Sequence, residues 1–169
     1  LSLEESVFRF KKLYKPKSFL IHEWNKEVAA EINAVTGFKN WEITNKSSNL
    51  MNVMSSWRCK YLANCLRIDF SKKYNFLYDC VFNLRTDVFA FSNINKKLVM
   101  KAKRKKDIIY VPWDWDFKNV NKIAVGDIMA FGSPEAMDKY YSLYKYAKNY
   151  RDKKISNHAE TLLGHHFIE

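Results

Sequence analysis

Apolar residues recur at helical spacing in several stretches of the chain, each bounded by residues that start or stop helices. Residues 51–70 show the pattern most clearly, with Lys60, Asn64 and Arg67 on a face of their own. Another stretch begins at Ser133-Pro134, where serine can cap a helix and proline fits its first turn. The sequence predicts helices at residues 2–14, 27–36, 51–70, from 134 onward, and at 157–167.

Mostly apolar runs indicate buried strands at residues 78–84 and 18–24, the second with polar residues at its carboxyl end. The predicted helix 51–70 lies between them, and a strand, helix, strand order implies a right-handed parallel crossover. Shorter runs predict small strands at residues 40–44, 97–100 and 108–111. We therefore expect an α/β fold with a mostly parallel central sheet, in one domain spanning residues 1–169.

Arg85 and Asp87 directly follow the predicted strand 78–84. Ligands of open α/β sheets bind beyond the carboxyl ends of the strands, and side chains two residues apart point the same way. An aspartate can hold a divalent cation, and a guanidinium can bind phosphate through two parallel hydrogen bonds. The pair is therefore a candidate diphosphate site, or an ion pair that closes the strand. His22, at the end of the other strand, is either a neighbour of this site or a structural histidine.

Asp127 interrupts an otherwise apolar run, directly after Gly126. A carboxylate in such a run needs a partner or a role, because burying an unpaired charge is costly. Asp114 and Asp116 form a D-x-D in a predicted loop, and we rank them below Asp87 as metal ligands. Asn157 and Glu160 have the spacing of a helix capping box.

The chain of 169 residues is 47% hydrophobic and carries a net charge of +11. This charge favours an acidic partner such as a nucleic acid, an anionic lipid or a phosphorylated substrate. The basic stretch from Lys101 to Lys106 is either a solvated loop or a contact with an anionic membrane surface. The cysteines lack a metal or disulfide pattern, which indicates free thiols in the core. No apolar run approaches the roughly 20 residues of a membrane span.

Three blocks of the sequence resemble the WavE-like glycosyltransferases of bacterial and viral lipopolysaccharide and capsule synthesis. They are residues 78–87 (YDCVFNLRTD), 126–140 (GDIMAFGSPEAMDKY) and 158–163 (HAETLL). Residues 18–24 and 54–57 are similar to the second strand of that family and the helix after it. The resemblance spans most of residues 7–168, in the same order. It has no counterpart of the family's first strand, which implies a domain incomplete at its amino terminus.

The resemblance implies a GT-A type, Rossmann-like three-layer α/β/α sandwich that transfers sugar from a nucleotide-diphosphate donor. The acceptor would be a glycan or lipid-linked glycan, and the location cytoplasmic or peripheral to a membrane. Arg85, Asp87 and His22 would bind the nucleotide sugar, with Asp87 on Mn²⁺ or Mg²⁺. Asp127 would be general base or acceptor ligand. His158 and Glu160 would complete the catalytic set.

Other classes of function stay open at the level of sequence. The chain could be a noncatalytic glycosyltransferase-like remnant. A basic nucleic-acid-binding module would use the charge and the aromatic residues, but no recognition signature appears, so no nucleic acid is expected. A zinc hydrolase could use His158, Glu160, His165 and His166, although their spacing matches no metal-protease motif.

Overall fold

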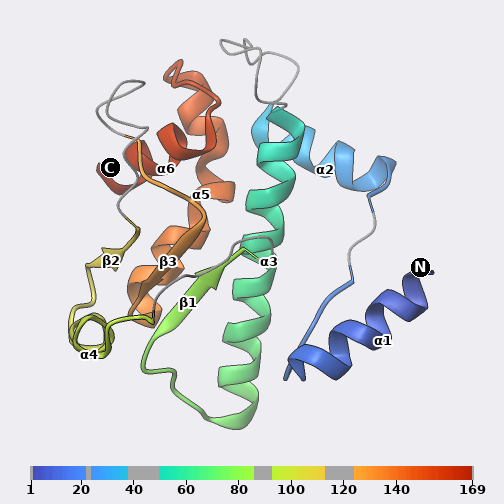
Figure 1. Cartoon of the computed structure of the whole chain (residues 1–169). Helices are drawn as coiled ribbons and strands as arrows, with labels where there is room; N and C mark the ends of the chain where they lie inside the picture. The colour runs from blue at the N-terminus through green and yellow to red at the C-terminus, as the bar shows by residue number, and fades with distance from the viewer. Residues whose placement is uncertain (1, 22–23, 38–49, 86–92, 113–123, 169) are drawn as a thin grey trace.

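The structure, a computed structural model, describes residues 2–21, 24–37, 50–85, 93–112 and 124–168. Six helices make up 64% of these residues, and one small sheet accompanies them (Figure 1). The helices are α1 (Leu3–Tyr14), α2 (Lys26–Thr36), α3 (Leu50–Tyr74), α4 (Lys96–Arg104), α5 (Pro134–Asp152) and α6 (Ala159–Ile168). The strands are β1 (Val81–Leu84), β2 (Ile109–Tyr110) and β3 (Met129–Gly132).

The sheet is antiparallel, with β3 between β1 and β2. The predicted Rossmann-like sandwich with a mostly parallel sheet is therefore wrong for the described residues. In an antiparallel pair the carboxyl end of one strand meets the amino end of the other. Leu84 accordingly pairs with Met129, and the next backbone bond runs from Arg85 N to Ile128 O at 3.2 Å. This register brings the end of β1 beside the segment that precedes β3.

Two predicted strands are not strands in the structure. Residues 18–21 and 24 have no strand partner among the described residues, so the parallel crossover is lost. Residues 97–100 lie in α4, which takes in most of the basic stretch as well. The Asn95 side chain caps this helix by accepting a hydrogen bond from Lys97 N. Partly buried Val99 and buried Ala102, three residues apart, follow a helical period rather than the alternation of a strand.

The predicted helices are confirmed, and their ends follow the expected local chemistry. Ser2 and Glu5 form a capping box at the start of α1. Gly37 closes α2 with a φ of 61°, in the left-handed region that glycine adopts without strain. Ser133 caps α5 and Pro134 occupies its first turn. The predicted strand at 108–111 appears as β2, whereas the strand expected at 40–44 lies outside the described residues.

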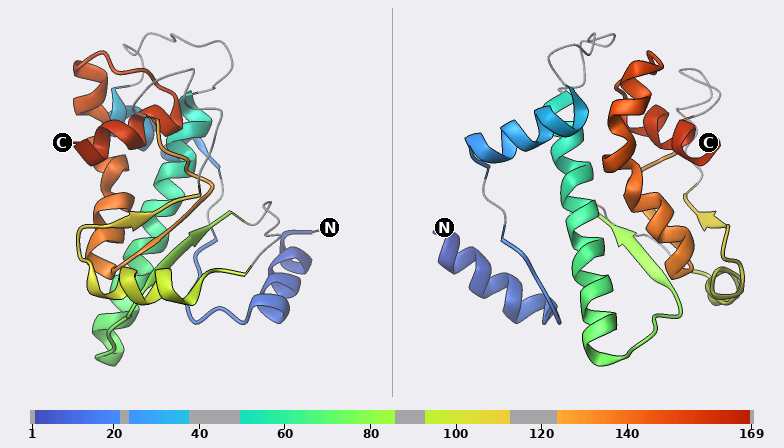
Figure 2. Two further views of the ribbon diagram at one scale, coloured as in Figure 1. Left: turned by 60° about the vertical axis from the view of Figure 1, so that its left-hand side comes forward. Right: turned by 180° about the vertical axis from the view of Figure 1, so that it is seen from behind.

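The core forms where the other elements pack on α5. Helices α2, α3 and α6 and strand β3 all contact it, and α3 and α5 lie side by side in Figure 2. The Trp57 and Tyr140 rings meet at 5.3 Å between α3 and α5. Fully buried side chains from four helices surround this contact; they include Ile32, Met54, Leu143, Tyr150, Leu162 and Leu163.

Helix α1 stands apart from this core (Figures 1 and 2). None of its described side chains is buried. The three cysteines are free thiols, as expected, but Cys59 is exposed on α3 rather than in the core. Among the described helices, none has both the length and the apolar composition needed to cross a bilayer.

Shortening a buried side chain of α5 should lower the stability of the protein strongly. Leu143 is fully buried, so Leu143→Ala should lower the free energy of unfolding by about 2–5 kcal/mol through lost burial and a cavity. Leu77→Ala is the matched control, because Leu77 is 87% exposed and should change stability by no more than about 0.5 kcal/mol. Urea denaturation measures both, and equal effects would contradict this core.

Candidate functional site

A buried ion pair joins α3 to the segment before β3. The Nζ of Lys60 lies 2.7 Å from Asp127 Oδ2 and 3.2 Å from the Asp127 carbonyl oxygen. The two side chains are only 10% and 9% exposed. The ammonium also lies 4.2 Å from the centre of the Trp57 ring, a cation–π contact. Asp127 thus has the partner that its place in an apolar run demands.

Helix geometry explains how a lysine reaches this position. Lys60 follows Trp57 by three residues and so lies on nearly the same side of α3. Asn64 continues this side: it is buried, and its side-chain amide donates to Asp138 of α5 at 2.8 Å. Arg67 binds the same Asp138 oxygen. The side of α3 with the sequence's polar residues therefore faces α5 and β3 rather than solvent.

Tyr140 of α5 supports Asp127 from within the core. Its hydroxyl lies 3.4 Å from the Asp127 carbonyl oxygen and accepts from the Asn83 side chain of β1, also at 3.4 Å. Burial, followed by the nearby Asp127 charge, raises the pKa of Tyr140 well above its ordinary value. The hydroxyl therefore keeps its proton and can donate it to the carbonyl oxygen, which holds the backbone of Asp127 in place.

Two more charged residues act on the Lys60 ammonium. Burial lowers the pKa of Lys60, while the charge of Asp127 and its hydrogen bond oppose that shift. The positive charge of Arg85 lowers the Lys60 pKa further, and the negative charge of Glu160 raises it. Both residues therefore lie within electrostatic reach of the buried pair. The antiparallel pairing of β1 with β3 places Arg85 beside Ile128, and the Arg85 side chain is exposed.

Glu160 and His158 lie together at the start of α6. His158 Nδ1 is 3.1 Å from Glu160 Oε2, and the side chains are 22% and 19% exposed. The Glu160 carbonyl accepts from Val125 N at 3.0 Å, which ties α6 to the segment that ends in Asp127. The predicted capping box of Asn157 and Glu160 is wrong. The first helical bond runs from Leu162 N to the His158 carbonyl, and the Glu160 carboxylate contacts His158.

Several buried polar atoms around these residues lack a partner within the described part of the chain. Both polar atoms of the fully buried Asn157 side chain are among them, with Trp57 Nε1 and Thr161 Oγ1. Leaving such an atom unpaired costs about 1–3 kcal/mol. Water, a polar ligand or a segment outside the described residues must therefore satisfy them. A ligand rich in hydroxyl groups has the hydrogen-bonding capacity that these atoms need.

The remaining predicted site residues fall outside the described part of the structure. These are Asp87 and His22, with the lower-ranked Asp114 and Asp116. The described residues contain no group of three His, Cys, Asp or Glu side chains that could hold a metal ion. Asp87, the predicted ligand of Mg²⁺ or Mn²⁺, is not among them.

His166, one of the ligands of the zinc-hydrolase alternative, contacts α5 through both ring nitrogens. His166 is buried, with its Nδ1 2.6 Å from the Tyr150 hydroxyl and its Nε2 2.6 Å from the Lys139 carbonyl oxygen. Both ring nitrogens are therefore engaged with α5. His158, Glu160, His165 and His166 are all described, and they form no metal-binding group.

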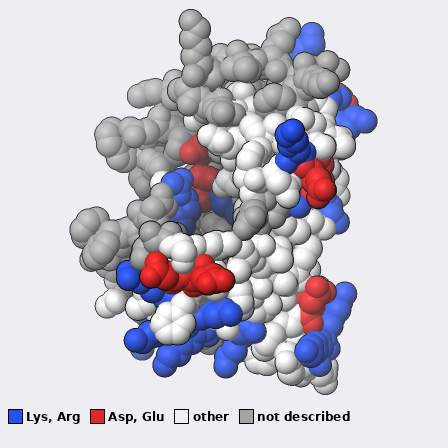
Figure 3. Space-filling view, turned by 90° about the vertical axis from the view of Figure 1, so that its right-hand side faces the viewer, with Lys and Arg blue, Asp and Glu red and all other residues white. Residues whose placement is uncertain are grey.

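Sequence reasoning found four of the residues gathered here and missed two. It singled out Arg85, Asp127, His158 and Glu160, but it assigned Lys60 to a separate polar face and gave Tyr140 no role of its own. The face shown in Figure 3 has acidic and basic side chains together in a recess. A signal for Lys60 was present in its spacing from Trp57, which places the lysine beside the buried side of the helix.

Comparisons with known proteins add no assignment. No family model matches the chain, and it matches no curated protein and no solved structure.

The buried pair predicts a pH-dependent contribution to stability. Between the lowered pKa of Lys60 and the ordinary lysine value of 10.5, the unfolded chain binds the proton more tightly than the folded protein. The contribution of Lys60 to the free energy of unfolding therefore rises with pH between these two pKa values. At neutral pH, Lys60→Met should cost about 3–5 kcal/mol, because Asp127 is left buried without a countercharge.

Urea denaturation at several pH values from neutral to 10 measures the effect. The difference between the wild type and Lys60→Met should grow as the pH rises. Lys72→Met, at an exposed position near the end of α3, is the matched control. A difference for Lys60→Met that stays constant over this range would contradict the burial of the ammonium.

Proposed function

We propose that the chain is a glycosyltransferase that moves a sugar from a nucleotide-diphosphate donor to a glycan or lipid-linked glycan acceptor. One observation carries the proposal. Arg85, Asp127 and Glu160 stand in three separate blocks that resemble WavE-like glycosyltransferases, and backbone hydrogen bonds bring these blocks together. Arg85 N donates to the Ile128 carbonyl and Val125 N donates to the Glu160 carbonyl, on either side of Asp127. These three residues, 33 or more positions apart in sequence, thus meet in one charged cluster. The proposal does not depend on a parallel sheet.

Arg85 is suited to bind the donor diphosphate. Its side chain is exposed at the end of β1, and a guanidinium binds phosphate oxygens through paired, charge-assisted hydrogen bonds. When the bond between the sugar and the diphosphate breaks, the electron pair stays on the diphosphate oxygen. A fixed positive charge at that point stabilises the departing group more than the bound donor, which is the condition for catalysis.

Asp127 is suited to take the proton of the acceptor hydroxyl. Lys60 occupies its Oδ2 at 2.7 Å, and Lys60 and Tyr140 hold its carbonyl oxygen, so the carboxylate has a fixed orientation. As the acceptor oxygen forms its bond to the sugar, its proton passes to the carboxylate of Asp127. Lys60 acts as a positioning residue, because its contacts are to Asp127.

The His158–Glu160 pair is suited to hold the acceptor. The two side chains are partly exposed, and the buried polar atoms of Asn157 and Thr161 adjoin them in sequence. Imidazole, carboxylate and amide groups together offer donors and acceptors to sugar hydroxyls. The proposal includes a cytoplasmic location. It also includes contact of Lys101–Lys106 with an anionic membrane surface, and participation of Asp87 with Mn²⁺ or Mg²⁺.

Asp127→Asn tests the base directly. General-base catalysis contributes about 10²–10⁴-fold, so release of nucleoside diphosphate from a panel of sugar nucleotides should fall at least about 100-fold. Asp69→Asn, at an exposed position on α3, should leave the rate unchanged. A thermal melt of each variant separates lost chemistry from lost folding. A folded Asp127→Asn protein with the wild-type rate would remove Asp127 from this role.

Arg85→Gln tests donor binding without relying on turnover. A ligand present at about 100 times its dissociation constant stabilises a folded protein by about 2.7 kcal/mol, which corresponds to a Tm increase of roughly 5–10 °C. We expect one nucleoside diphosphate, with or without Mn²⁺, to raise Tm in this way, and Arg85→Gln to abolish the increase. Arg9→Gln on α1 is the matched control. An equal increase in both variants would contradict the role of Arg85.

A further inference from the structure

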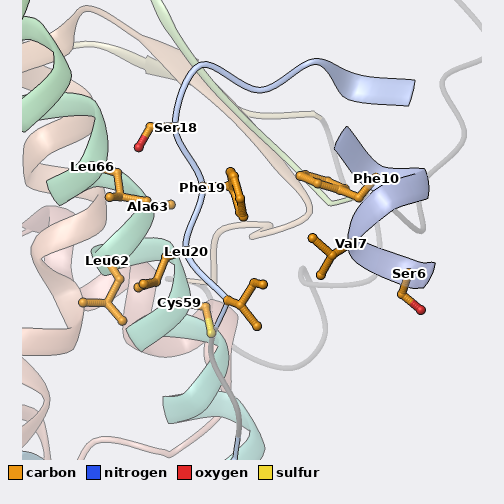
Figure 4. A pocket seen from close by; sticks show the side chains of 11 residues that line it. Ser6, Val7, Phe10, Ser18, Phe19, Leu20, Cys59, Leu62, Ala63 and Leu66 are labelled. Atoms are coloured by element: carbon orange, nitrogen blue, oxygen red, sulfur yellow. The ribbon is translucent and has the colours of Figure 1, made fainter. Parts of the chain in front are cut away.

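An apolar groove lies between α1 and α3 (Figure 4). We call it the α1–α3 groove; it has a volume of about 610 Å³. Val7 and Phe10 of α1 and Phe19 of the connecting segment line one side, and Leu62, Ala63 and Leu66 of α3 line the other. Pockets for small molecules measure about 300–1,000 Å³ and are lined mainly by apolar groups. The size and the lining of this groove both fall in that class.

The apolar side of α1 faces the groove without filling it. Leu3, Val7, Phe10 and Tyr14 follow the spacing of one helical stripe, and two of them line the groove. Even so, Phe10 is 39% exposed and Tyr14 is 61% exposed. Lys11 of α1 lies 4.5 Å from the Phe19 ring, which links the helix to the connecting segment. The stripe thus lies next to an apolar space that the described residues leave open.

The α3 side of the groove is also open. Cys59 and Ala63 are exposed in the middle of the longest described helix, while Trp57 and Asn64 on its other side are buried. Since the polar residues of α3 turn toward α5, an apolar strip of the same helix is left outside the core. Figure 4 shows the side chains of α1 and α3 on opposite sides of the space.

Basic residues cluster beside this groove, near the carboxyl end of α1. Residues 9–17 contain five basic side chains and no acidic one: Arg9, Lys11, Lys12, Lys15 and Lys17. Glu4 and Glu5 lie in the first turn of the helix. Lysine and arginine side chains also gather along the lower edge of the face in Figure 3, on the side of the molecule where α1 lies in Figure 1. An apolar space with a basic border complements an amphiphile with an anionic head.

We propose that the α1–α3 groove is a lipid site. A hydrocarbon chain of an anionic phospholipid enters between Phe10, Phe19 and Leu62, and the basic residues 9–17 hold the headgroup phosphate. The apolar stripe of α1 then covers the chain and gains the burial that it lacks in the protein alone. This site would bring the protein to a membrane surface without a spanning helix. It stands apart from the proposed sugar transfer and does not require it.

Vesicle flotation with the full chain tests the proposal. We expect binding to vesicles of phosphatidylcholine with phosphatidylglycerol, and at least tenfold weaker binding to phosphatidylcholine alone. Ala63→Trp fills the groove from an exposed position and should lower binding to the anionic vesicles at least tenfold. Ala30→Trp is the matched control, on an exposed position of α2 away from the groove, and should bind as the wild type does. Equal binding by both variants would overturn the proposal.

Cys59 provides a readout from inside the groove. It is an exposed thiol that lines the groove, whereas Cys65 and Cys80 are partly buried elsewhere. Anionic vesicles should slow maleimide labelling of Cys59 several-fold and leave the other two thiols unchanged, as mass spectrometry of the labelled peptides will show. Unprotected Cys59 in the vesicle-bound protein would mean that charge alone binds the surface, and the groove proposal would fail.

Charge reversal and oligomeric state complete the test. Lys12→Glu with Lys17→Glu should weaken binding to anionic vesicles several-fold, whereas Lys72→Glu with Lys73→Glu, the same charge change at the end of α3, should not. Equal losses in the two double variants would show a general charge effect and contradict a headgroup site at residues 9–17. Dimerisation in sedimentation velocity that Ala63→Trp abolishes would assign the groove to a second copy of the chain instead.

Discussion

The buried contact between Lys60 and Asp127 is the interaction on which the arrangement of charged residues depends. It joins the middle of α3 to the segment before β3 with both side chains about one-tenth exposed. Bringing two charges out of water costs several kcal/mol, and close approach with additional hydrogen bonds must offset that cost. The carbonyl oxygen of Asp127 and the face of Trp57 supply such contacts to the ammonium. Because isosteric apolar residues often stabilise a core equally well, a buried ion pair of this kind suggests a role beyond stability.

The orientation of α3 determines what lies on each of its two sides. The side of the helix that carries Lys60, Asn64 and Arg67 packs toward α5 and β3, where Asp127 and Asp138 provide the negative partners. The same rotation leaves an apolar strip of α3 facing α1 across an open groove. One helix therefore borders both a largely buried cluster of charges and an open apolar groove. We propose a phosphate-bearing sugar donor at the first and a hydrocarbon chain in the second.

Local features of the structure followed from the sequence, whereas strand direction and helix orientation did not. The ends of α1, α2 and α5 depend on caps within a few residues, and Ser2, Gly37 and Ser133 show these caps in the sequence itself. Whether strands pair parallel or antiparallel depends on contacts made far along the chain, so the apolar run 78–84 predicted a strand but not its partner. The antiparallel register brings Arg85 beside Ile128, next to Asp127, and the sequence did not predict this neighbour. The sequence did not predict which side of α3 faces the core. Ionic partners on α5 and before β3 hold the polar side of α3 inward, against the usual rule that polar residues face water.

Replacing the buried pair by apolar residues tests the central claim most directly. The measurement is nucleoside-diphosphate release from sugar nucleotides by the double variant Lys60→Met with Asp127→Leu, compared with its unfolding free energy. Similar apolar replacements of buried ion pairs are often neutral or stabilising by about 1–4 kcal/mol, so the double variant should fold. Our account predicts a folded protein that has lost release activity, because the pair serves chemistry rather than stability. A folded double variant that releases nucleoside diphosphate at the wild-type rate would contradict it.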